Sequence, residues 1–257
     1  MMFTEYGFME RFAAARQAGF GAVELLYPYG LDISEIRQQL DDNNLDLILV
    51  NSPVGEPTRN EKGLACLAGR QDEFRRSVDE ALSYALPLGV RFVHLLTGVP
   101  DPDLPREAVE DILLENLSWA AGLARSAGLT LTLEALNSRD VPGYYISTQR
   151  QAADIVQRVN SPFVRLQFDF YHCRRSGENE IETFVTLRPL VAHVQVADTP
   201  RRSEPGSGEL DFEAIFDCLK ATDYSGWVGC EYRPAEKTVA GLAWIDRYGL
   251  RTLMRNP

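Results

Sequence analysis

Residues 129–137 read LTLTLEALN, and the first six alternate strictly between apolar and polar side chains. Successive side chains of an extended strand point to opposite faces, so the leucines share one face and the two threonines share the other with Glu134. We expect the leucine face to pack against helices. Glu134, near the end of this strand, is then expected to point into the interior of a barrel.

The same arrangement recurs in three later segments of the chain. Each segment carries apolar residues on one face and places a polar residue near its end on the other face. These polar residues, with their segments in parentheses, are Asp169 (163–171), Gln195 (191–198) and Glu231 (226–233). Successive members are separated by roughly 30 residues, the length of one strand-and-helix unit. A structural core would have branched apolar residues at these inward positions, so the polar set indicates a functional site.

Strand-like and helical segments alternate along the whole chain. The expected strands are at 22–28, 45–52, 91–97, 129–137, 163–171, 191–198 and 226–233. The expected helices are at 8–19, 32–44, 69–89, 106–128, 148–159, 178–190, 211–222 and 235–250. This alternation predicts an α/β fold of parallel strands, and eight helices in about 250 residues are typical of a (β/α)8 TIM barrel. A doubly wound sheet is the alternative, but no GxGxxG motif follows the early strands.

The chain opens directly on its first helical pattern, so we expect most of the first barrel strand to be missing or reduced to residues 1–3. The expected fold is a single TIM-barrel domain over residues 1–257, with seven strands and eight helices. The missing strand would leave an open seam between barrel strands two and eight, with unpaired backbone groups that cost stability. A late start codon and a real truncation both explain it, and the intact mass of the native protein separates them. A partner chain or a homo-oligomer could complete such a barrel.

Composition and charge narrow the choice of partners. The 257 residues include 26 Lys and Arg against 37 Asp and Glu, a net charge of −11, which opposes sequence-independent binding of nucleic acid. No apolar run approaches the roughly 18 residues of a membrane span. The first residues, MMFTEYGFME, lack the regions of a signal peptide, and the four cysteines contain no CxxC pair. We therefore expect a cytoplasmic protein with no nucleic-acid partner and no membrane partner.

Glu134, Asp169, Gln195 and Glu231 would converge at the C-terminal mouth of the barrel, where TIM barrels carry their chemistry. Like charges this close raise each other's pKa values or require a cation. All four side chains are hard oxygen ligands, which favour Mg²⁺ or Mn²⁺ over zinc. Such a cation can polarise a carbonyl and stabilise an enediolate, while Glu134 and Glu231 remove and return a proton. The residues therefore predict aldose–ketose isomerisation, or epimerisation next to a carbonyl.

Four long stretches carry a family resemblance: LEALNSRDVPGYYIST (133–148), LQFDFYHC (166–173), HVQVADTPRRSEPGSGELDF (193–212) and YSGWVGCEYRP (224–234). Through them the chain resembles the hydroxypyruvate isomerase family, within the xylose-isomerase-like barrel superfamily. The resemblance extends over residues 1–250. It implies a metal-dependent isomerase with metal ligands at Glu134, Asp169, Gln195 and Glu231. It also implies that Glu134 and Glu231 are the proton donor and acceptor.

The resemblance further implies substrate-binding residues. In the related ketose epimerases, a His three residues after the metal-binding Asp and an Arg six residues after the third ligand bind substrate, spacings that correspond here to His172 and Arg201. An acidic residue six positions after the first ligand corresponds to Asp140. Apart from the resemblance, His94 near the end of an expected strand could contact substrate. His193, one layer deeper than the third ligand, is expected to orient the metal ligands.

The function expected from these residues is interconversion of hydroxypyruvate and tartronate semialdehyde, or of a close 2-oxo acid such as 2-oxotetronate. A ketose 3-epimerase is the enzymatic alternative; it would act on neutral sugars and would need no arginine for a substrate carboxylate. An endonuclease for abasic DNA would need a His-rich site and a basic face, whereas this chain has three histidines and a net charge of −11. A non-catalytic sugar-acid binding protein would bind its ligand without exchanging protons with solvent.

Overall fold

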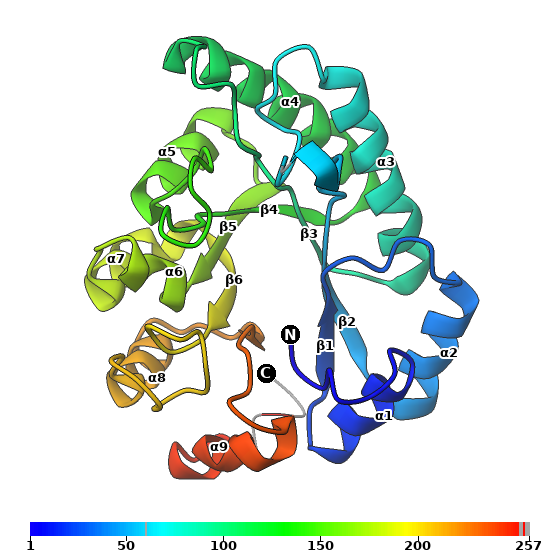
Figure 1. Cartoon of the computed structure of the whole chain (residues 1–257), viewed down its shortest axis with the longest axis vertical. Helices are drawn as coiled ribbons and strands as arrows, with labels where there is room; N and C mark the ends of the chain where they lie inside the picture. The colour runs from blue at the N-terminus through cyan, green and yellow to red at the C-terminus, as the bar shows by residue number, and fades with distance from the viewer. Residues whose placement is uncertain (60, 252–253, 255–257) are drawn as a thin grey trace.

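The structure is a computed structural model that describes residues 1–59, 61–251 and 254. Seven parallel strands form one sheet in sequential order and curve into a nearly closed barrel, with the helices outside it (Figure 1). The strands are β1 (Ala22–Leu25), β2 (Asp46–Asn51), β3 (Phe92–His94), β4 (Thr130–Glu134), β5 (Val164–Asp169), β6 (Val191–Val196) and β7 (Val228–Cys230). The predicted seven-stranded α/β barrel is therefore confirmed.

The described part of the chain contains nine α-helices, one more than the sequence predicted. They are α1 (Glu10–Gln17), α2 (Ile33–Asn43), α3 (Gln71–Leu88), α4 (Arg106–Ala127), α5 (Gln149–Val159), α6 (Phe170–Arg175), α7 (Glu180–Leu187), α8 (Phe212–Ala221) and α9 (Ala243–Arg247). Three short 3₁₀ helices are η1 (Pro57–Arg59), η2 (Arg188–Leu190) and η3 (Thr238–Leu242). Across these described residues, no helix is both long and apolar enough to cross a membrane.

The additional helix is α6, which starts directly where β5 ends. The Asp169 carboxylate accepts hydrogen bonds from the backbone N–H groups of Tyr171 (2.7 Å) and His172 (3.4 Å), and so caps the first turn. The sequence had predicted an extended strand up to residue 171. The last predicted helix, 235–250, is instead a 3₁₀ turn followed by the short α9.

Local signals at the helix ends agree with the structure. Asp32, Thr148 and Asp211 accept hydrogen bonds from the first free N–H groups of α2, α5 and α8. Gly89 and Gly128 end α3 and α4 in the left-handed conformation that glycine adopts without strain. These ends set where each following strand begins.

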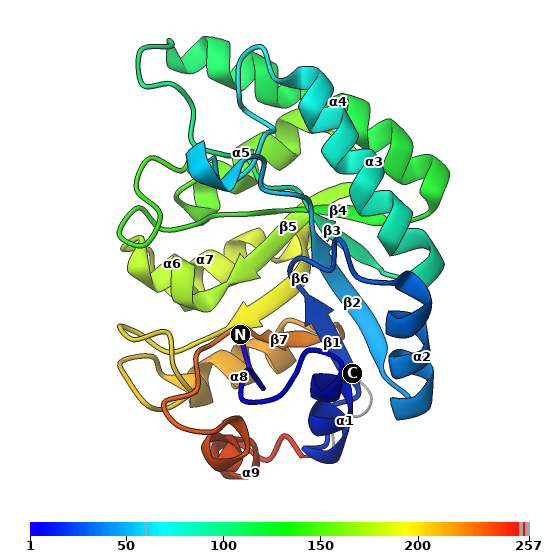
Figure 2. The same cartoon turned by 45° about the vertical axis from the view of Figure 1, so that its right-hand side comes forward.

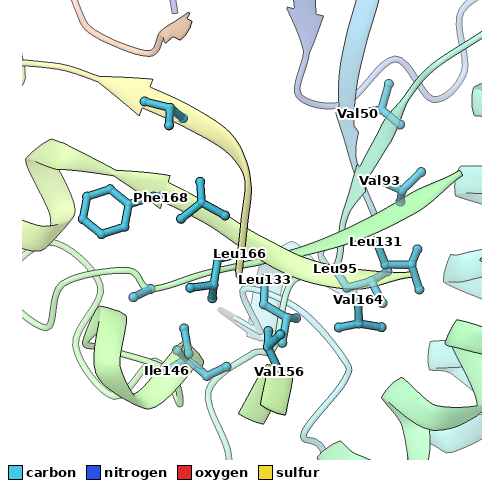
Figure 3. Packing of buried hydrophobic residues seen from close by; sticks show 14 of the residues in the cluster. Val50, Val93, Leu95, Leu131, Leu133, Ile146, Val156, Val164, Leu166 and Phe168 are labelled. Carbon is cyan, nitrogen blue, oxygen red and sulfur yellow. The ribbon is translucent and has the colours of Figure 1, made fainter. Parts of the chain in front are cut away.

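The two faces of the strands are divided as the alternation predicted. Leu133, Leu166 and Phe168 are fully buried in the same apolar cluster as Val156 of helix α5, between the barrel and the helices (Figure 3). On the opposite face, the Thr132 hydroxyl donates a hydrogen bond to Gln167 Oε1 (3.0 Å). The barrel interior is therefore polar at this level.

Strands β1 and β7 form the two edges of the sheet in the described part of the chain, and residues 1–9 contain no strand. Strand β7 pairs with β6, and Figure 2 shows the labels of β7 and β1 in the lower half of the barrel. A cavity of about 530 Å³ lies beside these two edges, lined mainly by apolar side chains from the strands and from α1, α8 and α9. The expected seam is therefore present.

Replacement of Leu166 by alanine tests this packing. Leu166 is 0% exposed, and removing its buried side chain should lower the free energy of unfolding by about 2–5 kcal/mol. The same replacement at Leu86, which is 52% exposed on α3, should change it by less than about 0.5 kcal/mol. Urea unfolding followed by circular dichroism measures both variants. Equal losses would contradict the assignment of the outer strand face.

Candidate active site

The four polar residues predicted at strand ends lie at the carboxyl end of the barrel. Glu134 and Asp169 are the last residues of β4 and β5, Gln195 lies in β6, and Glu231 directly follows β7. In the strand register, Asp169 is opposite Gln195, and Gln195 is opposite Gly229. The first three are buried, and the Glu231 side chain is 14% exposed. The sequence therefore placed these side chains correctly on the strands.

Three carboxyl groups share this buried space. Burial, together with the charges of Glu231 and Asp169, raises the pKa of Glu134 well above its usual value. Burial also raises the pKa of Asp169 and raises that of Glu231 to about 7, although the nearby Arg202 charge opposes both shifts. Raised values of this kind are typical of groups that hold and release protons near neutral pH.

Two oxygens in this cluster, Glu134 Oε1 and Asp169 Oδ2, are buried and have no hydrogen-bond partner among the described residues. An unpaired ionised oxygen in a protein interior is costly. Asp169 Oδ2 has the Arg202 guanidinium 3.5 Å away, so Glu134 Oε1 is the oxygen that requires a proton or a further cation. One oxygen of each residue and a ring nitrogen of His172 lie within 4.8 Å of one another. This trio could bind a metal ion.

The structure brings Arg202 to the carboxylates. Its guanidinium Nη2 lies 3.2 Å from Glu231 Oε2 and 3.5 Å from Asp169 Oδ2, over the ring of Tyr171. Arg201, which the resemblance implied as a substrate ligand, is exposed on the same loop. Arg202, which has a φ of +55°, is therefore the arginine of this loop that contacts the carboxylates.

His172 points a hydrogen-bond donor at the cluster. Its Nδ1 accepts hydrogen bonds from the backbone N–H (3.0 Å) and the side-chain amide (2.7 Å) of Asn137. The proton of the neutral ring is therefore on Nε2, which lies 3.9 Å from Asp169 Oδ2 and has no partner within the described part of the chain. Burial, and then the Arg202 charge, lower the pKa of His172, so the ring is neutral.

Asp140 supports this histidine from behind. Its carboxylate accepts hydrogen bonds from Tyr171 (2.6 Å), from the Asn137 side chain (3.0 Å) and from Arg175 (3.3 Å). These bonds outweigh burial and lower the pKa of Asp140. Asn137 thus holds both Asp140 and His172. The role of Asp140 in substrate binding stays a prediction.

His94 lies on the other side of Glu134. Its Nδ1 is 3.3 Å from Asn51 Oδ1 and 3.6 Å from Glu134 Oε2, and burial lowers its pKa to about 3. Its Nε2 has no hydrogen-bond partner among the residues that the structure describes. A neutral imidazole at this place can contact a substrate oxygen or support Glu134.

Two interior residues were not assigned a role from the sequence. Gln167 donates hydrogen bonds to Glu134 Oε2 (3.2 Å) and to Gln195 Oε1 (2.7 Å). Glu24 of β1 pairs with His193 and accepts a hydrogen bond from Gln195, interactions that hold the pKa of Glu24 below its usual value despite burial. Both residues share the inward phase of their strands, and this signal could have identified them.

Comparisons with known proteins agree with this fold. The family described as xylose isomerase-like TIM barrel matches residues 12–248. The hydroxypyruvate isomerase of Escherichia coli (strain K12) is 38% identical over 248 residues, which cover 96% of this chain and 96% of that protein. The 2-oxo-tetronate isomerase of Cupriavidus necator is 39% identical over 251 residues, covering 96% and 95%. A crystal structure from Brucella melitensis, described as an AP endonuclease of family 2, has a TM-score of 0.93 and 42% identity, covering 96% and 95%.

The fold and the buried acidic cluster thus define a xylose isomerase-like TIM barrel. Within that class, the chain belongs to the family of hydroxypyruvate isomerase and 2-oxo-tetronate isomerase. This membership agrees with the resemblance found in the sequence.

The state of His172 can be measured directly. We expect a neutral ring with its proton on Nε2 at pH 7, and protonation only well below the ordinary pKa of 6.5, because burial and Arg202 disfavour the charged form. Long-range ¹H–¹⁵N NMR of histidine-labelled protein reports the tautomer and the titration. The variant His172→Gln assigns the signal among three histidines. A proton on Nδ1, or a midpoint near 6.5, would contradict this geometry.

Proposed function

We propose that this protein interconverts hydroxypyruvate and tartronate semialdehyde, or a close 2-oxo acid such as 2-oxotetronate. The observation that carries the proposal is the pair Glu134 and Glu231, two buried carboxyl groups with raised pKa values at one mouth of the barrel. The names of the relatives from Escherichia coli and Cupriavidus necator support the substrate class.

The two glutamates account for the proton balance of this reaction. One carboxylate removes a proton from C3 of hydroxypyruvate, which gives an enediolate. The other carboxyl group delivers a proton to C2, while a proton moves from the C3 oxygen to the C2 oxygen. The product is tartronate semialdehyde, with no net gain or loss of atoms. Glu231, whose pKa is raised to about 7, can either remove or deliver a proton near neutral pH.

A divalent cation, Mg²⁺ or Mn²⁺, fits the donor set of this site. The oxygens Glu134 Oε1 and Asp169 Oδ2 are buried without a hydrogen-bond partner among the described residues, and Gln195 and Glu231 add two further hard oxygen donors. These four residues would hold the ion, whereas His172 would not be a ligand, because its Nδ1 accepts from Asn137 and its Nε2 carries the ring proton. When bound, it would polarise the substrate carbonyl and offset the negative charge of the enediolate.

Arg202 and His172 are the residues that would orient the substrate. Arg202 supplies a planar fork of donors that suits a carboxylate, and it is the guanidinium that faces the carboxylate cluster. His172 would donate its Nε2–H to a substrate oxygen, and His94 would contact the substrate beside Glu134. A small hydroxy or oxo acid is the partner that this set of groups favours.

A panel of substrates tests the proposal. Hydroxypyruvate, 2-oxotetronate, a neutral ketose and an abasic DNA duplex are incubated with the protein and Mg²⁺ or Mn²⁺, with EDTA as the control. We expect metal-dependent conversion of a 2-oxo acid. Faster turnover of the ketose would favour the 3-epimerase, and cleavage of DNA would favour the endonuclease, although the net charge of −11 opposes it. Ligand binding without turnover would favour a non-catalytic binding protein.

Replacement of either glutamate by glutamine tests its proton-transfer role. Glu134→Gln and Glu231→Gln should each lower kcat by at least about 10²–10⁴-fold, because an amide cannot remove a proton. The melting temperature should remain near that of the wild type, since the side-chain volume is kept. Near wild-type turnover in one of the variants would exclude that residue as a catalytic acid or base.

The adjacent arginines provide a matched pair. Arg202→Ala should raise KM for hydroxypyruvate by about 10–100-fold, the usual cost of losing a charged hydrogen bond. Arg201→Ala, on the exposed neighbour, should leave KM within about threefold of the wild type, because the cost of an exposed group is small. Steady-state kinetics of the two variants decide between them. A larger effect at Arg201 would restore the original sequence-based assignment.

A further inference from the structure

Glu24 joins two strands that lie on opposite sides of the seam. It is on β1, the edge strand, yet its carboxylate contacts β6. Oε1 lies 2.6 Å from His193 Nε2, and Oε2 accepts a hydrogen bond of 2.7 Å from Gln195 Nε2. Strand β7 pairs with β6 and is the other edge of the sheet, so the carboxylate reaches β6 past β7.

Gly229 of β7 provides the space for this crossing. It is opposite Gln195 in the register of β6 and β7. A Cβ atom at residue 229 would collide with Glu24 Oε1 and would lie 2.9 Å from Gln195 Cγ. Any side chain here would therefore displace Glu24 or Gln195, and the missing side chain is what allows them to meet.

The contact with Glu24 determines which way the Gln195 amide faces. An ionised carboxylate only accepts hydrogen bonds, so it must face the amide nitrogen of Gln195 and not the oxygen. The amide oxygen then faces the other side, where it accepts the Gln167 hydrogen bond of 2.7 Å. Gln167 also donates to Glu134 Oε2, so the Gln195 oxygen is on the same side as the buried carboxylates.

We propose that Glu24 is a positioning residue for the cation site: by holding the amide nitrogen of Gln195, it presents the Gln195 oxygen as a ligand. Gly229 is also required for this positioning, because the absence of a side chain there leaves room for the Glu24 carboxylate. The role rests on the metal site of the proposed function. Glu24 itself touches neither substrate nor cation.

The expected effect is a loss of metal affinity. Groups that orient a ligand from behind typically contribute 10–100-fold to metal affinity, so Glu24→Ala should weaken Mn²⁺ binding by about that factor. Glu24→Gln should have an intermediate effect, because its amide oxygen can still accept from Gln195, while its amide nitrogen faces the His193 Nε2.

Mn²⁺ alone is the probe, and its binding is followed by electron paramagnetic resonance without substrate. Glu110→Gln is the matched control, since Glu110 pairs with Arg158 away from the cluster. Gly229→Ala should reproduce the loss seen in Glu24→Ala, whereas Gly122→Ala, with open space beside it on α4, should not. The free energy of unfolding of each variant separates loss of affinity from loss of fold.

Each outcome has a definite meaning. Weaker Mn²⁺ binding in folded Glu24→Ala and Gly229→Ala, with both controls unchanged, supports the positioning role. Wild-type affinity in those variants overturns it and leaves the proposed function intact. If Glu24→Ala fails to fold, Glu24→Gln and Gly229→Ala decide by the same criterion. A wild-type protein that binds no Mn²⁺ overturns both the positioning role and the metal site.

Discussion

The burial of three carboxyl groups at one mouth of the barrel sets the requirements for the rest of the site. Glu134, Asp169 and Glu231 repel one another in a region from which water is largely excluded, so their charged forms are disfavoured. Arg202 is the cationic side chain that contacts this cluster, through Asp169 and Glu231. Glu134 Oε1, which has no hydrogen-bond partner among the described residues, is available to a cation or to a proton.

Buried polar groups also need hydrogen-bond partners deeper in the barrel interior, beyond the mouth. Gln195 donates a hydrogen bond to Glu24, and Gln167 donates to both Gln195 and Glu134. This series connects β1 with β4 through the interior and links the strands on the two sides of the seam. Because buried polar groups are costly unless paired, a fully connected series also fixes one orientation for each amide. The orientation of the Gln195 amide and the link between strands on the two sides of the seam thus depend on the same bonds.

The strand-end residues could be predicted because alternation along a strand fixes the direction of each side chain. Glu134 and Asp169 needed no more than this rule and the regular spacing of the βα units. Arg202 could not be distinguished from Arg201 in that way, since a loop has no such period and the backbone at Arg202 has an unusual φ of +55°.

Glu24 illustrates a different limit of sequence analysis. Alternation in β1 predicts that Glu24 points inward, but it does not predict which strand the carboxylate contacts. The contact with β6 depends on an absent side chain at Gly229, about 200 residues later in the chain. The residue pattern within one strand does not reveal space that a glycine on a distant strand creates. For the same reason, the hydrogen bonds that hold Asp140 became visible only when Tyr171 and Asn137 were brought beside it.

The central claim is that two carboxyl groups transfer a proton through an enediolate, and exchange with deuterated water tests it most directly. Hydroxypyruvate is incubated in D₂O with the protein and Mg²⁺ or Mn²⁺, and carbon-bound deuterium is followed by NMR before equilibrium is reached. We predict deuterium at C2 of the tartronate semialdehyde and at C3 of the remaining hydroxypyruvate, with none in the presence of EDTA. Conversion that leaves the carbon positions free of deuterium would exclude proton transfer by two separate carboxyl groups and would contradict the account.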